Sequence, residues 1–323
     1  MDISECISLC PSCLKNVGKE KEICPICQSP LSLENRPHQL AAGSALNGKY
    51  YIGKALGESP LSISYIGLDL TKNQKVIIKE FFPKENTSRH EDGYTVVPND
   101  ENADGEYSFD TKKTRFIERI NNLAFFRRYK GIVNLLDKFE ENDTFYKVME
   151  FTKGVSLSKV YENNKPFLPD DLLDILEPVF MVTDAFNTER ILHGAISPEN
   201  IIVTDEGAML LDLAEDLELC KKEAVSSSYY APEYFMDWEE IASQADIYSL
   251  AAVYYKGITG ITPPLSQVRI KGDILDLPSI ISKKININLE SVMLKGLSVN
   301  PRKRYDKASR FYDDLVSAIL NRK

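Results

Sequence analysis

The stretch LHGAISPENII, residues 192–202, decides the fold that we expect for the rest of the chain. In it, a polar turn at Ser197–Asn200 is followed by two isoleucines, and a second apolar run ends shortly afterwards at Asp212. Between the two apolar runs, residues Thr204–Gly207 have the composition of a tight turn. The pattern therefore predicts a loop, a short strand, a tight turn and a second strand.

Composition places the chain among globular proteins. It has 323 residues, of which 43% are hydrophobic and 27% charged, and this length suits about two domains. The net charge of −9 argues against a broad nucleic-acid-binding surface. No apolar run approaches the roughly 18 residues of a membrane span, and residues 1–20 lack the apolar centre of a signal peptide. We therefore expect a cytoplasmic protein, in which paired cysteines bind metal rather than form disulfides.

Five of the six cysteines lie near the amino terminus. Four of them form two C-x-x-C pairs, Cys10 with Cys13 and Cys24 with Cys27. Each pair can place two thiolates on one side of a tetrahedral zinc ion, and so short a segment needs metal in order to fold. We predict a structural zinc ribbon over residues 1–32, with Cys6 as a non-ligand. The alternatives are surface thiols without metal, or a redox pair, which the lack of a βαβ pattern disfavours.

The first half of the chain after the cysteines has the pattern of strands. Residues 33–48 are polar and are predicted to be a linker. Residues 50–56 and 66–70 then flank a turn of small residues, which predicts a β-hairpin. Residues 76–83 form a β-branched strand that carries one lysine, Lys79, and residues 85–106 are expected to be irregular.

After one helix and two more strands, the second half of the chain has the spacing of helices. Helical spacing first appears over residues 111–128, and residues 132–136 and 145–151 are expected to form two more strands across an Asn-Asp turn. Further helices are predicted over residues 172–190, 241–260, 289–297 and 309–320. Strands followed by helices predict an α+β chain with a strand-rich and a helix-rich half.

From about Leu46 to Asn321 the sequence resembles a bacterial serine/threonine protein kinase. More narrowly, it resembles the Firmicutes-type group with an N-terminal zinc ribbon. The stretches that carry the resemblance are Leu46–Gly53, Ile78–Pro83, Ile196–Asn200, Tyr230–Glu233, Asp246–Leu250 and Asn300–Arg304. Their order and spacing make the resemblance specific. It implies a bilobal kinase-like fold, with a β-rich N-lobe over residues 49–152 and a helical C-lobe over residues 153–323.

The resemblance also implies a nucleotide site. Lys79 matches the family's phosphate-binding lysine, and Asn200 and Asp212 match its two metal ligands. Gly57 matches the first glycine of the phosphate-covering loop, and Glu150 lies in the hinge between the lobes. We expect these residues to meet in one cleft that binds ATP and Mg²⁺ weakly if at all.

Three further residues match structural positions of the family. Glu233 and Arg304 are expected to form a buried ion pair. Asp246 is expected to brace the catalytic loop.

The sequence departs from the family at the residues that do chemistry. Ala195 occupies the position of the aspartate that acts as the catalytic base, and Gly194 replaces the arginine beside it. Without that arginine, Ser226–Ser228 are expected to be a solvated loop rather than a phosphorylation switch. Arg119 stands where the family has a glutamate that pairs with the lysine, and Glu118 lies on another face of the helix.

The phosphate-covering loop departs as well. Ser59 and Ser62 replace its second and third glycines, and Pro60 contributes no N–H group. These changes predict a pseudokinase that serves as a binding, scaffold or nucleotide-sensing module for a protein partner. The alternative is an active atypical serine/threonine kinase, or another ATP-dependent transferase, that uses Lys79, Asn200 and Asp212.

Overall fold

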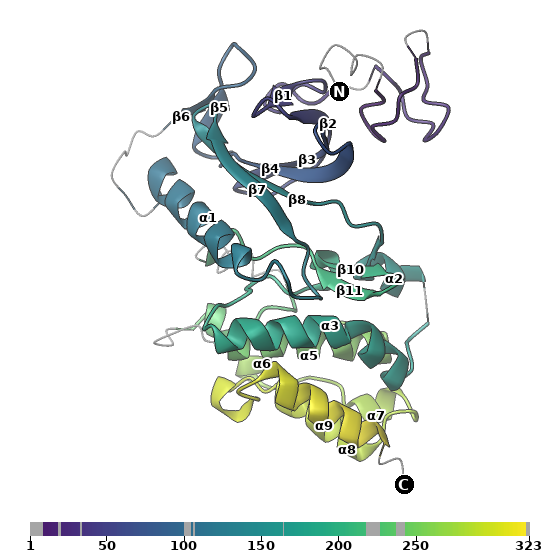
Figure 1. Ribbon diagram of the computed structural model, residues 1–323. Helices are drawn as coiled ribbons and strands as arrows, with labels where there is room; N and C mark the ends of the chain where they lie inside the picture. Colours follow the sequence, from purple (N-terminus) through teal and green to yellow (C-terminus); the bar gives the residue numbers. More distant parts are fainter. Residues whose placement is uncertain are drawn as a thin grey trace. The chain divides into compact units, whose positions relative to one another are not determined.

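The computed structural model describes residues 9–18, 21–32, 34–99, 105, 107–163, 165–217, 227–236 and 243–320. The chain forms two compact units (Figure 1). The first contains Met1–Ala124 and Asn134–Phe151, and the second contains Phe125–Val133 and Thr152–Lys323. The boundary after Phe151 lies beside the predicted boundary at residue 152.

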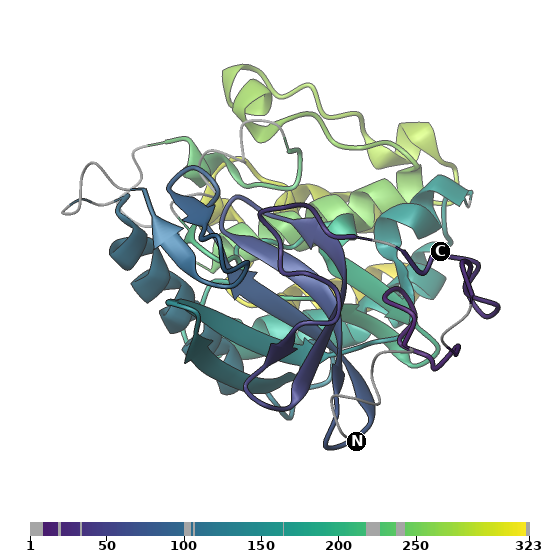
Figure 2. The same cartoon turned by 90° about the horizontal axis from the view of Figure 1, so that it is seen from above.

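The first unit is built on a six-stranded antiparallel sheet that is strongly twisted (Figure 2). In sheet order its strands are β1 (Ala45–Leu46), β2 (Tyr50–Glu58), β3 (Ser62–Asp69), β4 (Gln74–Phe81), β8 (Thr144–Glu150) and β7 (Leu135–Glu141). Asn142 and Asp143 both have positive φ, 55° and 58°, at the turn between β7 and β8. Such two-residue turns suit the right-handed twist of a hairpin, as the predicted Asn-Asp turn requires.

The helix α1 (Phe109–Ala124) packs on one face of this sheet. The rings of Phe109 and Phe116 lie 5.3 and 5.2 Å from that of Phe81. The prediction of a helix over residues 111–128 was too long at its end. The chain leaves the helix after Ala124 because residues 125–133 belong to the second unit, where Phe126 packs 4.3 Å from the ring of Phe186.

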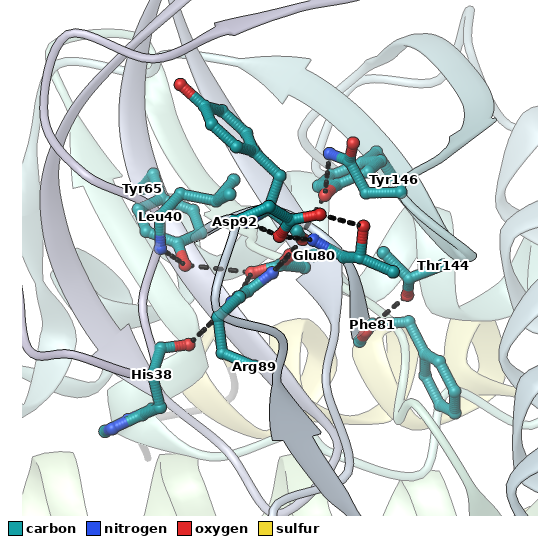
Figure 3. A network of polar contacts seen from close by, with 12 residues as sticks. His38, Leu40, Tyr65, Glu80, Phe81, Arg89, Asp92, Thr144 and Tyr146 are labelled. Carbon is teal, nitrogen blue, oxygen red and sulfur yellow. Dashed lines mark hydrogen bonds and ion pairs between the residues drawn. The ribbon is translucent and has the colours of Figure 1, made fainter. Parts of the chain in front are cut away.

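The opposite face of β4 carries a buried network of charged and tyrosine side chains (Figure 3). Glu80 is fully buried and pairs with Arg89, and the hydroxyls of Tyr65 and Tyr146 donate to it at 2.9 Å. Arg89 ends β5 (Thr87–Arg89), which pairs with β6 (Val96–Pro98). The prediction of an irregular segment over residues 85–106 was therefore wrong in part. Each strand has only three residues, too few for an alternating pattern to show.

The segment predicted to be a linker is held against the sheet. β1 lies within it and pairs with the start of β2. The backbone N–H of Leu40 donates to the hydroxyl of Tyr65 at 3.0 Å, and Arg89 donates to the carbonyl oxygen of His38 at 2.9 and 3.1 Å. These contacts are polar, so the composition of residues 33–48 gave no sign of them.

In the described part of the second unit, helices surround one small sheet. Its helices are α2 (Leu157–Asn163), α3 (Pro169–Thr188), α5 (Gln244–Thr259), α6 (Ser266–Lys271), α7 (Pro278–Ile281), α8 (Ile287–Gly296) and α9 (Ala308–Leu320). The sheet has the order β11 (Gly207–Leu210), β10 (Ile201–Thr204), β9 (Val155–Ser156). Almost all of α5 is buried, which makes it the core of this unit. Among the described residues, no helix combines the length and the apolar character that crossing a bilayer requires.

Candidate functional site

The four cysteines predicted as zinc ligands converge on one point. Their sulfur atoms all lie within 4.8 Å of one another, with Cys10 and Cys27 3.6 Å apart and Cys13 and Cys24 3.7 Å apart. Zn–S bonds of about 2.3 Å in a tetrahedron place sulfur atoms about 3.8 Å apart, so the cluster could hold one zinc ion. Cys6 and Cys220 lie outside the described residues.

The local backbone prepares the sulfur atoms for a metal. The backbone N–H groups of Ile26 and Cys27 point at the sulfur of Cys24, at 3.4 and 3.5 Å. Burial raises the pKa of Cys13 to about 12, whereas hydrogen bonds from the side chain and backbone of Ser29 lower the pKa of Cys27 to about 6. A metal ion that binds here must therefore displace protons from the buried thiols.

Lys79 lies on the face of the sheet that α1 covers. It is directly opposite Lys147 in the β4–β8 register, so the two side chains share one face. The ammonium group of Lys147 lies 5.1 Å from the ring centroid of Phe116 in α1. Lys79 is half-buried, and it does not lie on the Glu80 face of its strand. The role of Lys79 at a nucleotide site stays a prediction.

The charges on α1 also follow the predicted register. Phe116 and Ile120 face the sheet, and Arg119 beside them is half-buried. Glu118 is exposed, because it lies about 200° around the helix from Phe116. The helix therefore offers a guanidinium, rather than a carboxylate, at the position that the resemblance assigns to the pairing glutamate.

The turn between β2 and β3 uses its own backbone donors. The hydroxyl oxygen of Ser59 accepts from the N–H of Leu61 at 3.2 Å and from the N–H of Ser62 at 2.9 Å. Leu61 is buried, and its carbonyl oxygen accepts from the N–H of Phe82 at 2.7 Å. Two backbone N–H groups of the turn thus donate to a serine hydroxyl, and the turn is hydrogen-bonded to the residue that follows β4.

The other two residues of the first unit that were predicted at the nucleotide site lie close to the ends of strands. Gly57 is exposed near the end of β2, and nothing lies within 4 Å of where its Cβ would be. Glu150 ends β8, where its N–H donates to the carbonyl oxygen of Asn134 at 2.9 Å and its carboxylate accepts from the Asn134 amide at 2.9 Å. Lys79, Gly57 and Glu150 belong to the first unit, whereas Asn200 and Asp212 belong to the second. Their meeting in one cleft stays a prediction.

In the second unit, the stretch 192–202 forms the expected loop, and Asp246 braces it from α5. One oxygen of Asp246 accepts from the N–H of His193 at 2.7 Å, and the other accepts from the N–H of Gly194 at 2.9 Å. Asp246 is 1% exposed, so these bonds are protected from water. The carboxylate fixes the backbone directly before Ala195.

A backbone hydrogen bond brings together the segments that carry the two predicted metal ligands. The backbone N–H of Leu211 donates to the carbonyl oxygen of Asn200 at 2.9 Å, which places Asp212 next to this contact. The amide nitrogen of Asn200 donates to the carbonyl oxygen of Ala195 at 2.9 Å and leaves the amide oxygen available for a metal. One oxygen of Asp212 accepts from the N–H of Leu213 at 2.9 Å. A carboxylate and an amide oxygen are ligands that Mg²⁺ prefers.

Gly194 has a conformation that other residues rarely adopt. Its φ is +78°, and an added Cβ would lie 2.6 Å from Leu217 and 3.1 Å from the Cβ of Ala214. Two apolar side chains therefore fill the space that a side chain at position 194 would need. Ser226 lies outside the described residues, so the interpretation of Ser226–Ser228 as a solvated loop stays a prediction.

The predicted structural ion pair is present. Both terminal nitrogens of Arg304 donate to the carboxylate of Glu233, at 2.6 and 2.8 Å, and both side chains are almost fully buried. Arg304 also donates to the carbonyl oxygens of Ser298 and Gln244, at 2.7 and 2.9 Å. The guanidinium thus joins the 3-10 turn at residues 232–234 to the start of α5.

The same order of elements recurs in proteins of known family. A family model described as a protein kinase domain matches residues 50–322. The chain belongs to the protein kinase family. Within the kinase, the six-stranded sheet with α1 is the N-lobe and the helical unit is the C-lobe.

Relatives of this kinase domain are bacterial serine/threonine kinases. It is 25% identical over 294 residues to a probable serine/threonine-protein kinase of Clostridium acetobutylicum. The alignment covers 86% of this chain and 41% of that relative. It is 24% identical over 291 residues to the serine/threonine-protein kinase PrkC of Bacillus subtilis, with the same two shares. The chain thus spans about two fifths of the length of these curated relatives.

Solved structures show the same fold. The structure titled "PpkA-294 apo form" aligns with a TM-score of 0.71 at 24% identity and covers 87% of this chain and 99% of that one. A crystal structure of Rad53 residues 1–466 in complex with AMP-PNP aligns with a TM-score of 0.63 at 16% identity, covering 84% and 66%. At these identities the likeness establishes the fold of the kinase domain.

Lys147 is a residue near the candidate site that sequence reasoning missed. It is 2% exposed, yet it carries a charge on the α1 face of the N-lobe sheet. Finding it would have required the pairing register of β4 and β8, because Lys79 and Lys147 become neighbours only when these strands pair.

Proposed function

We propose that this kinase domain is a pseudokinase, a fold kept for binding rather than for phosphate transfer. The observation that carries the proposal is Ala195, held at the position of the base by Asp246 and Asn200. Its methyl group can neither accept the proton of a substrate hydroxyl nor position that hydroxyl. Loss of a general base typically reduces a rate by about 10²–10⁴-fold.

The surroundings of Ala195 support the same conclusion. The turn at Ser59–Ser62 engages two of its backbone N–H groups internally, and Arg119 stands in place of the glutamate. A phosphate-covering loop needs free donors, and an arginine at the glutamate's position cannot form the ion pair that orients the family's lysine. Several linked parts of the phosphotransfer machinery are therefore altered, so a single substitution is not the whole defect.

Nucleotide sensing without turnover is a second candidate, favoured by Asn200 and Asp212. These side chains would hold a Mg²⁺ ion, and Lys79 would contact a phosphate of ATP. ATP would supply phosphate oxygens as further metal ligands. In this role the C-lobe residues bind and orient the nucleotide, while Ala195 leaves its terminal phosphate untransferred.

We infer further that Cys10, Cys13, Cys24 and Cys27 hold one structural zinc ion. Elemental analysis of the purified protein should find about one zinc per chain, because the four sulfur atoms already have nearly tetrahedral spacing. A content well below one zinc per chain would end this inference. The comparison variant is Cys27→Ser, which lacks one sulfur ligand and should bind less zinc per chain than the natural protein.

The decisive experiment follows transfer of labelled phosphate from ATP, for the natural sequence and for Asp212→Ala as the blank. We expect equal signals, far below the roughly 1–100 s⁻¹ typical of kinases. Turnover by the natural protein that vanishes in Asp212→Ala would instead establish the atypical transferase. Thermal shifts with ATP, with and without Mg²⁺, separate the remaining roles. A Mg²⁺-dependent stabilisation indicates a nucleotide sensor, and its absence indicates a scaffold.

A further inference from the structure

The two C-x-x-C knuckles have the same backbone but different surroundings. Leu14 and Gln28, which follow the second cysteine of each pair, have nearly equal positive φ values of 59° and 61°. Leu14 is buried against the N-lobe sheet, whereas Ile23 and Ile26 of the second knuckle are 56% and 60% exposed. Among the described core residues, the first knuckle is therefore the one that packs on the sheet.

That partner is the free edge of β2. β1 pairs only with Tyr50 and Tyr51, and the β2–β3 register shifts between Ile52 and Ala55. Because β1 ends opposite Tyr51, no described strand lies beside Gly53, Lys54 and Ala55 on the outer side of β2. An exposed edge of this kind needs other partners for its N–H and C=O groups.

The amino-terminal segment supplies those partners. The carbonyl oxygen of Pro11, inside the first knuckle, accepts from the N–H of Lys54 at 2.7 Å. The Asn35 side chain accepts from the N–H of Ala55 at 2.9 Å and donates to the carbonyl oxygen of Gly53 at 3.1 Å. The knuckle and Asn35 together act as a substitute for a strand.

The contact is close and partly apolar. A Cβ on Gly53 would lie 2.5 Å from the Pro11 oxygen and 2.9 Å from Leu14, so only glycine admits the knuckle. The core beneath it contains Leu9 and Leu14 of the ribbon together with Tyr51, Ile66, Leu68 and Leu70 of the sheet. The interior of the ribbon, by contrast, consists mainly of Cys10, Val17 and Cys24. Such an interior cannot hold the knuckle in shape without the metal.

We propose that the edge of β2 is a docking surface for the zinc-loaded first knuckle, so that metal occupancy controls the order of the β2–β3 turn. Lys54 lies three residues before Gly57, and the turn at Ser59–Ser62 follows directly. Zinc holds Pro11 and Leu14 in place, and these hold β2 where it enters the phosphate-covering loop. The inference rests on the proposed zinc site and adds its connection to the kinase domain.

The test is hydrogen exchange on the whole chain, with zinc content measured on the same samples. Removing zinc with a chelator should raise exchange of residues 53–62 at least tenfold, while α5 residues 250–253 stay unchanged. Gly53→Ala keeps all four cysteines, so it should retain zinc but show the fast exchange of the zinc-free protein. Leu14→Ser provides a second docking variant in case Gly53→Ala does not fold.

The outcomes separate the two proposals. Zinc bound at about one per chain, with exchange of residues 53–62 unaffected by its removal, would overturn the docking inference and leave the zinc site standing. Absence of zinc from the natural protein would overturn the zinc site, and metal control of β2 with it. Fast exchange in both the chelated protein and the zinc-loaded docking variants supports the inference.

Discussion

Arg89 holds Glu80 through two parallel hydrogen bonds, from Nη1 to Oε1 and from Nη2 to Oε2, each 2.7 Å long. Figure 3 shows this pair, and both side chains are nearly inaccessible to water. Arg89 also donates to the carbonyl oxygens of His38 and Tyr94, so one guanidinium joins three segments of the N-lobe. The pair fixes the residues between the ribbon and the sheet as well as the β5–β6 hairpin.

Replacing Arg89 by methionine should destabilise the N-lobe strongly. The substitution leaves the Glu80 carboxylate buried without its cation, which typically costs about 3–5 kcal/mol. Urea denaturation followed by circular dichroism measures the loss. Arg310→Met is the matched control, because its pair with Asp306 is exposed and should contribute under about 1 kcal/mol. Equal losses in the two variants would contradict the structural role of the Glu80–Arg89 pair.

Much of the fold could be predicted because its long elements have clear periods. The strands around Lys79 alternate or run apolar, and α5 and α9 carry the spacing of packed helices. The β5–β6 hairpin could not be predicted, since three-residue strands show no period. Its organising contact, Glu80 with Arg89, joins two charged residues that composition would place on the surface.

The candidate site, too, could be predicted from the sequence only in part. The roles of Asp246 and Glu233 followed from motifs, and both contacts are present. The sequence could not show that the Ser59 hydroxyl accepts from backbone N–H groups of its own turn. A serine at a glycine position can equally point outward. The positive φ of Gly194 was also hidden, since only the packing of Leu217 and Ala214 shows how little space remains there.

Gly194→Ala should destabilise the C-lobe by about 1–2 kcal/mol, the usual cost of the left-handed conformation for a residue with a Cβ. The contact with Leu217 should add to this loss. Gly272→Ala is the control, since Gly272 has an extended φ of 174° and open space around its Cα. Thermal unfolding of the two variants makes the comparison. A Gly194→Ala protein as stable as Gly272→Ala would show that the loop relaxes without strain.

Ser59→Ala should open the turn between β2 and β3. The N–H groups of Leu61 and Ser62 lose their acceptor, and each such hydrogen bond contributes about 1 kcal/mol. Amide exchange at these two residues should therefore accelerate. Ser88→Ala is the control, because the Ser88 hydroxyl donates to the exposed side chain of Asn99. If free donors limit phosphate binding, Ser59→Ala should also show a larger thermal shift with ATP and Mg²⁺ than the natural protein.

Ala195→Asp should restore little phosphate transfer. The carboxylate would return to a loop that Asp246 already holds in place, so its position is prepared. The turn closed by Ser59 and the arginine at position 119 would remain, and a restored base repairs neither of them. The assay compares labelled phosphate transfer by Ala195→Asp with transfer by Ala195→Asn, which has nearly the same shape without the charge. Equal signals are expected. A gain of about 10²-fold or more by the aspartate alone would show that the missing base is the only defect.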